Sequence, residues 1–251
     1  MFRTGQRSFW LELGLSLTDK LQIEHNLARL ELYTEQLAQI DEEIDRLSLT
    51  TTWQSEMRLL MQLPGSGPLT GMTILGAIGD ISRFASAKKL VGYAGLGSSV
   101  HSSGGKTRTG AITKTGRKDL RRSMVQVARA ALRAHPIWQR QYDELCRRMP
   151  KQKAIVAIAR KLLVAIWHIL TKRIADTQTS VERIAYRFAV WYWRLPKSLK
   201  EGWTNALFMR WQLMQLGIGD QLSRVPVPSN KGANKLLRLA TPEETLAFFE
   251  T

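Results

Sequence analysis

At 251 residues the chain is long enough to bury a hydrophobic core, and 44% hydrophobic with 23% charged residues exclude a collagen-like or wholly disordered protein. Its 37 Lys and Arg residues outnumber 21 Asp and Glu residues, and the isoelectric point near 10.4 predicts a polyanionic partner such as nucleic acid. A membrane surface is the rival partner. No membrane-spanning helix is expected, because the most apolar segment, 154–170, contains Arg160 and Lys161.

Cysteine and histidine usage bears on the compartment and on metal binding. Cys146 is the single cysteine, so an internal disulfide and a cysteine metal cluster are excluded. Glu12 interrupts the only apolar stretch near the amino terminus that could act as a secretion signal. The four histidines lack zinc-ligand spacing. We therefore expect a cytoplasmic, nucleoid-associated protein with no metal or cofactor bound by this chain.

Residues 1–51 are expected to form an acidic helical arm. Apolar residues recur there at alternating intervals of three and four: Leu30, Tyr33, Leu37, Ile40, Ile44 and Leu47. This spacing is typical of a coiled-coil or helical-hairpin seam. A homo-oligomer through the arm and an amphipathic helix packed on its own domain are equally compatible with so few heptads. The acidic faces argue that the arm does not lie on DNA.

A compact helical domain is expected over residues 52–177, beginning with a helical hairpin. Two short helices, about 52–62 and 69–78, flank the turn Leu63-Pro64-Gly65-Ser66-Gly67-Pro68. In a helix-hairpin-helix element, such a turn presents backbone N–H groups to a DNA phosphate, and Gly65 and Gly67 would permit the close approach. A tight interhelical turn without a ligand is the alternative, and the net charge favours the phosphate.

The segment 98–114 is rich in Ser, Gly, Thr and charge, and is predicted to be an extended loop or a β-hairpin. The segment 117–134 has helical periodicity, with an apolar face opposite Arg122, Gln126, Arg129 and Arg133. Pro136 and Pro150 each begin a further helix, and the second should form the domain core. The fold class is therefore mainly α.

The segment from Gly95 to Arg122 places Ser102 and Ser103 beside two glycines and a dense set of cations. A hydroxyl there could attack a phosphodiester while the cations stabilise charge on the phosphate oxygens. From chemistry alone, a solvated basic loop that only holds DNA is the better interpretation. Gly105-Lys106-Thr107 resembles the end of a P-loop, but Val100 stands where that motif needs its first glycine.

Residues 178–251 form a tryptophan-rich tail of unknown role. Its aromatic residues fall in two predicted helices, where a cluster is more often core than a base-stacking surface: Trp191, Tyr192, Trp193, Trp203 and Trp211. The segment Val225-Pro226-Val227-Pro228-Ser229-Asn230 is expected to be a linker-like break.

Residues from Leu63 to about Thr171 resemble the carboxy-terminal domain of the insertion-sequence-110 transposase family, which includes the 116 and 902 elements and Piv-type DNA invertases. The stretches that carry the resemblance are LPGSGPLTGMTILGAIGDISRF, KLVGYAGL, SGGK at Ser103 to Lys106, RTGAITKTGRKDLRR, and AIARKLLVAIWHIL. The acidic arm is similar to the coiled-coil connector of that family.

The resemblance implies a DNA transposase or site-specific recombinase that forms a covalent phosphoserine intermediate through the serine at position 103. It also implies an amino-terminal RuvC-like domain with four carboxylates that bind magnesium, and a structured guide RNA from the element. Nothing before Leu63 offers strands bearing aspartates, so this half of the site is expected to be missing and the chain alone inactive. A truncated copy, a frameshifted element and a separately encoded half remain open.

The leading alternative is a non-catalytic nucleic-acid-binding module of the helix-hairpin-helix kind, and a third class is an oligomeric scaffold built by the arm. The residues expected to contact DNA are Gly65, Gly67, Lys106, Arg108, Lys114, Arg117, Lys118, Arg121, Arg122 and Arg129.

Overall fold

The computed structural model describes residues 9–10, 12–103, 106–176, 179–200, 202–227 and 235–250, and its mainly helical character confirms the expected fold class. In chain order, the elements are α2 (Leu17–Ser48), α3 (Gln54–Met61), α4 (Pro68–Ile78), the 3-10 turn η2 (Ile81–Arg83), α5 (Ala87–Tyr93), β1 (Ser98–Ser103), β2 (Lys106–Ile112), α6 (Lys118–Ala134), α7 (Pro136–Cys146), α8 (Lys151–Lys172), α9 (Val181–Arg194), the 3-10 turn η3 (Lys197–Leu199), α10 (Asn205–Met214), β3 (Arg224–Val227), β4 (Lys235–Arg238) and α11 (Pro242–Glu250).

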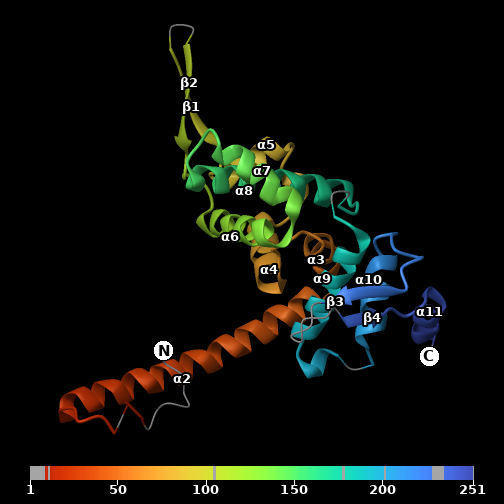
Figure 1. Cartoon of the computed structure of the whole chain (residues 1–251), viewed down its shortest axis with the longest axis horizontal. Helices are drawn as coiled ribbons and strands as arrows, with labels where there is room; N and C mark the ends of the chain where they lie inside the picture. Colours follow the sequence, from red (N-terminus) through yellow and green to blue (C-terminus); the bar gives the residue numbers. More distant parts are fainter. Residues whose placement is uncertain are drawn as a thin grey trace.

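Helix α8 is the central helix, as the sequence predicts, and α3, α5, α6 and α7 pack against it (Figure 1). Its residues Ile158 and Leu162 are fully buried, as are Met124 and Val127 of α6. Helix α6 ends at His135 because Pro136 follows, and the His135 Nδ1 then accepts a hydrogen bond from the Ile137 N–H at the start of α7. The proline thus separates two helices without a long loop.

Helix α8 also differs from the sequence expectation in one respect. By length and apolar composition alone it is long enough to cross a membrane, although it contains Arg160 and Lys161. The packing of four helices against it accounts for part of this composition, because a core helix is apolar on several sides.

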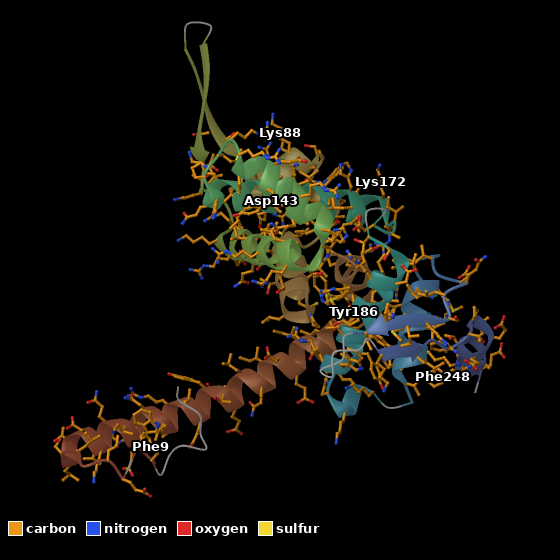
Figure 2. The ribbon with its side chains drawn as sticks, viewed as in Figure 1. Phe9, Lys88, Asp143, Lys172, Tyr186 and Phe248 are labelled. Atoms are coloured by element: carbon orange, nitrogen blue, oxygen red, sulfur yellow. The ribbon has the colours of Figure 1, made fainter. Side chains whose placement is uncertain are left out.

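Helix α2 forms an arm that leaves the helical body at its carboxy end, where it packs on α4. Ser16 caps the helix by accepting the Asp19 N–H at 3.2 Å. The side chains along most of α2 stand away from the other helices (Figure 2). Leu37 and Ile40 of the predicted seam are 60% and 55% exposed, so the middle of the seam is uncovered within the chain.

The tail packs on the body through α3 and α9 and builds a small unit of α9, α10, α11 and the antiparallel pair β3–β4. Trp191 is fully buried and stacks edge-on with Phe208 of α10, which confirms the core interpretation for this tryptophan. By contrast, Trp193 is 46% exposed.

The prediction of a linker at 225–230 is wrong for the residues of this segment that the structure describes, because Val225 and Val227 lie in β3. Both valines are buried while Arg224 and Pro226 face outward, which is the period-two pattern of a half-buried strand. Residues 228–230 lie outside the described part of the chain.

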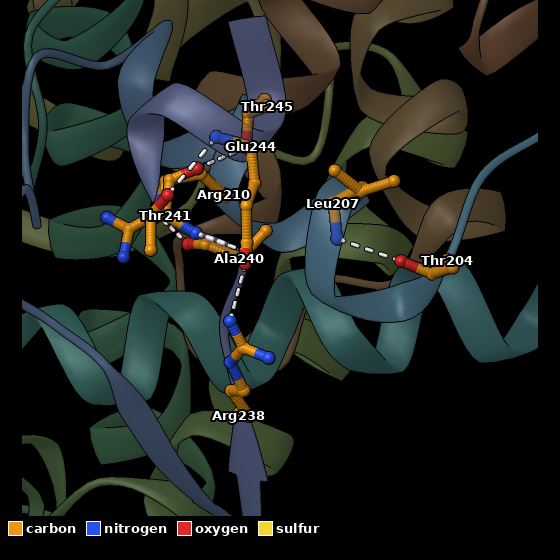
Figure 3. Close-up of polar contacts among 8 residues, drawn as sticks. All are labelled: Thr204, Leu207, Arg210, Arg238, Ala240, Thr241, Glu244 and Thr245. Carbon is orange, nitrogen blue, oxygen red and sulfur yellow. Dashed lines mark hydrogen bonds and ion pairs between the residues drawn. The ribbon is translucent and has the colours of Figure 1, made fainter. Parts of the chain in front are cut away.

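The end of the tail is held by polar contacts, drawn in Figure 3. The buried guanidinium of Arg210 donates from Nε to the Ala240 carbonyl at 2.7 Å and from another nitrogen to the Gly219 carbonyl at 2.6 Å. Thr241 and Glu244 form a capping box, because each side chain accepts the backbone N–H of the other. These contacts fix α10, β4 and α11 to one another.

Candidate nucleic-acid interface

The basic Ser/Gly segment forms a β-hairpin, one of the two structures expected for it. Strands β1 and β2 are antiparallel, and Ser103 pairs with Lys106 at the end where β1 finishes and β2 begins. The strands project from the helical body, away from the bundle (Figure 1). Gly104 and Gly105 lie outside the described residues, and only the backbone is described for Ser103, Lys106 and Arg108.

The base of the hairpin is tied to α5 by backbone hydrogen bonds that sequence reasoning missed. The Thr113 N–H donates to the Gly97 carbonyl at 2.9 Å, and the Arg117 N–H donates to the Tyr93 carbonyl at 2.8 Å. A Cβ on Gly116 would stand 2.1 Å from that same Tyr93 oxygen. Only glycine fits there. The glycines that flank the basic segment were therefore the sequence signal that could have indicated this contact. They set where the hairpin leaves the body.

Helix α6 begins directly after this base and carries a row of exposed polar residues, four of which are cations. We call Lys118, Arg122, Gln126, Arg129 and Arg133 the α6 basic stripe; all are exposed and they recur at helical spacing along one face. The row runs for ~22 Å at 1.5 Å per residue. The predicted polar face of this helix is therefore confirmed. A row of this length and charge matches the phosphates along one edge of a nucleic-acid backbone.

Two cations that precede α6, Arg117 and Lys114, are in different environments from the stripe. Arg117 shares its Nε between both carboxylate oxygens of Asp119 at 3.0 Å, and it also contacts the Tyr93 hydroxyl. The hydrogen bonds to Tyr93 and to Asp119 raise the pKa of Arg117, so its guanidinium stays charged. Lys114, at the hairpin base, is exposed and adopts a positive φ of 56°.

Arg121, for which the sequence predicts DNA contact, is hydrogen-bonded to the backbone within the chain. Its half-buried guanidinium donates to the Ala94 carbonyl at 3.1 Å and to the Gly116 carbonyl at 3.4 Å. The side chain therefore joins the end of α5 to the loop before α6. Its first role is to position the hairpin base.

The turn between α3 and α4, predicted to contact a DNA phosphate, makes close contacts within the chain. The two-helix hairpin is present, but a Cβ on Gly65 would stand 2.6 Å from the Val127 carbonyl oxygen, and one on Gly67 would stand 2.8 Å from a guanidinium nitrogen of Arg194. The glycines thus permit close approach of the turn to α6 and to α9, and phosphate binding by Gly65 and Gly67 stays a prediction. The buried hydroxyl of Ser66 donates within the turn, to the Leu60 and Leu63 carbonyls.

The candidate interface therefore consists of the hairpin, its base and the α6 basic stripe. Residues 52–177, which contain it, carry 22 Lys and Arg residues against six Asp and Glu residues. Within the part of the chain that the structure describes, no three His, Cys, Asp or Glu side chains are grouped as metal ligands would be.

Comparison with known proteins bears directly on this region. Residues 57–143, from α3 to α7, match the family described as "Transposase IS116/IS110/IS902 family". The transposase for insertion sequence element IS1111A of Coxiella burnetii is 30% identical over 183 residues, covering 67% of this chain and 49% of that protein. A probable family 20 transposase of Pseudomonas aeruginosa is 29% identical over 169 residues, covering 64% of this chain and 45% of that protein.

The pilin gene-inverting protein of Moraxella bovis is 32% identical over 161 residues, covering 62% of this chain and 49% of that protein. The chain thus spans about half the length of the curated relatives that it matches. The match includes the helical hairpin, and it includes the β-hairpin and α6, which build the candidate interface. Through residues 57–143, the chain belongs to the IS116/IS110/IS902 transposase family.

Proposed function

We propose that this chain is the DNA-binding, serine-bearing part of a recombinase that acts in DNA transposition. The observation that carries the proposal is the place of Ser103 at the end of β1, on a hairpin whose base leads directly into the α6 basic stripe, within the family segment. Relatives described as transposases and as a pilin gene-inverting protein have DNA rearrangement in common. DNA is therefore the proposed substrate.

In the proposed reaction, the Ser103 hydroxyl oxygen attacks the phosphorus of a phosphodiester. A serine–phosphate bond forms, the bond from phosphorus to one deoxyribose oxygen breaks, the hydroxyl proton leaves, and the released sugar oxygen gains a proton. The phosphoserine preserves a phosphodiester, so a new sugar hydroxyl can reverse the step and rejoin DNA. Lys106 pairs with Ser103 along the hairpin, and its positive charge would favour a phosphate nearby.

Magnesium does not fit a site among the described residues, since their acidic side chains form no cluster. The proposal assigns any magnesium to a RuvC-like domain acting with this chain, as the family resemblance implies. Ser103 would then be one half of a composite site.

Two further partners belong to the proposal. A structured guide RNA from the element would meet the same basic surface, because an RNA backbone carries the same phosphate charge as DNA. Self-association through α2 is proposed because Leu37 and Ile40 stand exposed on the arm. A DNA-bound protein of this kind would be nucleoid-associated in the cytoplasm.

The test is a search for a covalent serine adduct. The full chain is combined with a RuvC-like domain from a relative, guide RNA, magnesium and end-labelled DNA, and the products are separated by denaturing electrophoresis. We expect a protein–DNA adduct with the unchanged chain and with Ser102→Ala, and none with Ser103→Ala, while all three bind DNA equally in a filter assay.

Three results would contradict parts of this proposal. An adduct that survives in Ser103→Ala would assign the nucleophile to another residue. Retention of DNA by the unchanged chain with no adduct under any of these conditions would favour the non-catalytic binding module. Cleavage by the chain alone would contradict the composite site.

A further inference from the structure

A hollow of about 970 Å³ lies between the base of the β-hairpin, α7 and the outer face of α8, and we call it the α8 groove. Its floor is largely apolar, formed by Ile112, Trp138, Val156, Ala157, Val164 and Ala165. On α8, the lining runs from Gln152 to His168, which is ~24 Å of helix at 1.5 Å per residue. The groove is therefore long enough to hold about four turns of another helix.

The floor of the groove is apolar surface that the chain itself leaves uncovered. Although α8 is the central helix, less than half of its most apolar stretch is buried. Val156, Ala157, Val164 and Ala165 are only half-buried, and they stand in two adjacent rows along the helix, with Arg160 between the two valines and Lys161 between the two alanines. Alanines at such positions allow a second helix to approach within the 8–10 Å typical of packed helices.

The lining of the α8 groove is also positively charged. Lys114, Lys153, Arg160 and Lys161 line it, and none of the lining residues is Asp or Glu. Lys161 is held in place, because its ammonium donates to the Gln141 side-chain oxygen at 2.8 Å. An occupant that suits this groove is elongated, apolar on one face and of net negative charge.

Helix α2 has each of these properties. It carries eight Asp and Glu residues against three Lys and Arg residues. Its apolar stripe contains Tyr33, Leu37 and Ile40, each more than half exposed, and the stretch from Leu30 to Ile44 is ~21 Å long. The stripe and the groove thus correspond in length and in apolar character, and the net charges of the arm and of the groove lining are opposite in sign.

The geometry of the arm argues against an occupant from the same molecule. Helix α2 is one continuous helix, it packs on α4, and it extends away from the helices that border the groove (Figure 1). A second copy of this chain meets no such restriction. Because an isologous contact closes on itself, two copies that exchange arms would form a dimer with two identical contacts.

We propose that α2 of one copy docks its apolar stripe in the α8 groove of a second copy, and that the exchange is reciprocal. This inference rests on the proposed self-association through the arm, and it names the surface that receives the arm. It differs from a coiled coil, in which the arm would pair with another arm.

The test uses two full-length variants in nuclease-treated preparations, followed by sedimentation. Leu37→Glu places a charge in the apolar stripe, and the double variant Ala157→Glu, Ala165→Glu places two carboxylates in the floor of the groove, where they repel an acidic arm. Leu32→Glu is the matched arm control, because Leu32 is 50% exposed and lies outside the stripe. Ala134→Glu, at the exposed end of α6, is the control for the groove. Circular dichroism melts verify that every variant is folded.

We expect the unchanged chain and both controls to be dimers, and each of the two disruptive variants to be a monomer by itself. When the two disruptive variants are mixed, the intact arm of the groove variant can still enter the intact groove of the Leu37→Glu variant. A heterodimer with one contact should therefore form, with at least tenfold weaker association than the unchanged dimer.

Each of the other outcomes of this test contradicts a specific part of the proposal. If Leu37→Glu leaves the dimer unchanged, or the unchanged chain is a monomer, self-association through the arm is wrong, and this inference fails with it. If Leu37→Glu gives a monomer while the groove variant stays a dimer, the arm pairs with another arm and only this inference fails. A groove variant that stays dimeric but binds single-stranded nucleic acid more weakly would assign the groove to nucleic acid.

Discussion

Gly65 lies against α6 so closely that a Cβ on this residue would stand 2.6 Å from the Val127 carbonyl oxygen. Gly65 also has a φ of +86°, a backbone conformation that residues other than glycine rarely adopt. The close packing of the turn between α3 and α4 therefore holds the helical hairpin against α6, the helix that carries the basic stripe.

The first prediction is that Gly65→Ala lowers the free energy of unfolding by about 2–4 kcal/mol, because it combines backbone strain with overpacking against α6. Gly76→Ala is the matched control, since Gly76 lies within α4, is exposed, and has open space where its Cβ would be. That control should raise stability by about 0.5–1 kcal/mol. Urea unfolding measures both. Equal effects of the two substitutions would contradict the packing role.

The second prediction concerns the α6 basic stripe. Changing Arg122, Arg129 and Arg133 together to Gln should weaken DNA binding for all sequences. The slope of log affinity against log salt should become shallower by about 0.9 for each phosphate that the protein no longer neutralises. Fluorescence anisotropy across a salt series measures the slope.

A control with the same change of charge replaces three exposed cations of the tail with Gln: Arg183, Lys197 and Arg224. This control should bind DNA nearly as well as the unchanged chain, because its charges lie outside the proposed interface. If the control weakens binding as much as the stripe variant does, net charge rather than the stripe holds DNA.

The third prediction concerns Asp45, near the base of the arm. Burial raises the pKa of its carboxyl from 3.8 to about 6, with Asp41 and Glu42 acting in the same direction and Arg194 opposing. Because the folded-state pKa is the higher one, this group favours folding most below about pH 4, and that contribution is lost as pH rises through about 6.

Asp45→Asn should therefore raise Tm at about pH 8, and the gain should shrink at about pH 4.5. Differential scanning calorimetry at both pH values tests this, with Glu35→Gln on the exposed part of α2 as the control. A Tm that falls at the higher pH would show that the carboxylate of Asp45 is stabilised by the fold.

The fourth prediction is that Arg210→Met lowers the free energy of unfolding by about 3 kcal/mol or more. The substitution leaves carbonyl groups of Ala240, Gly219 and Leu222 without their donor, and each unsatisfied buried group costs about 1–3 kcal/mol. Arg224→Met, at an exposed position of β3, should change stability by less than about 0.5 kcal/mol. Similar destabilisation of both variants would contradict the anchoring role of Arg210.

Elements with a strong local signal could be predicted from the sequence. Leu120, Met124, Val127 and Ala131 recur at helical spacing, and Pro136 ends the helix, so α6 and its exposed basic face were both predictable. The hairpin carrying Ser103 was one of two expected structures, and the family segment was recognisable from its motifs. The strand β3 was missed because two prolines near Val225 and Val227 are more typical of a linker.

The sequence by itself determined the mainly helical fold, the net positive charge and the family, because periodicity, composition and motifs are local properties of the chain. Only the tertiary structure decided which neighbour each residue meets. Gly65 meets the carbonyl of Val127 and Arg121 meets that of Ala94, whereas the local sequence around each is equally compatible with DNA contact. Such contacts join residues dozens of positions apart, and the packing of whole helices brings them together, so no local pattern encodes them.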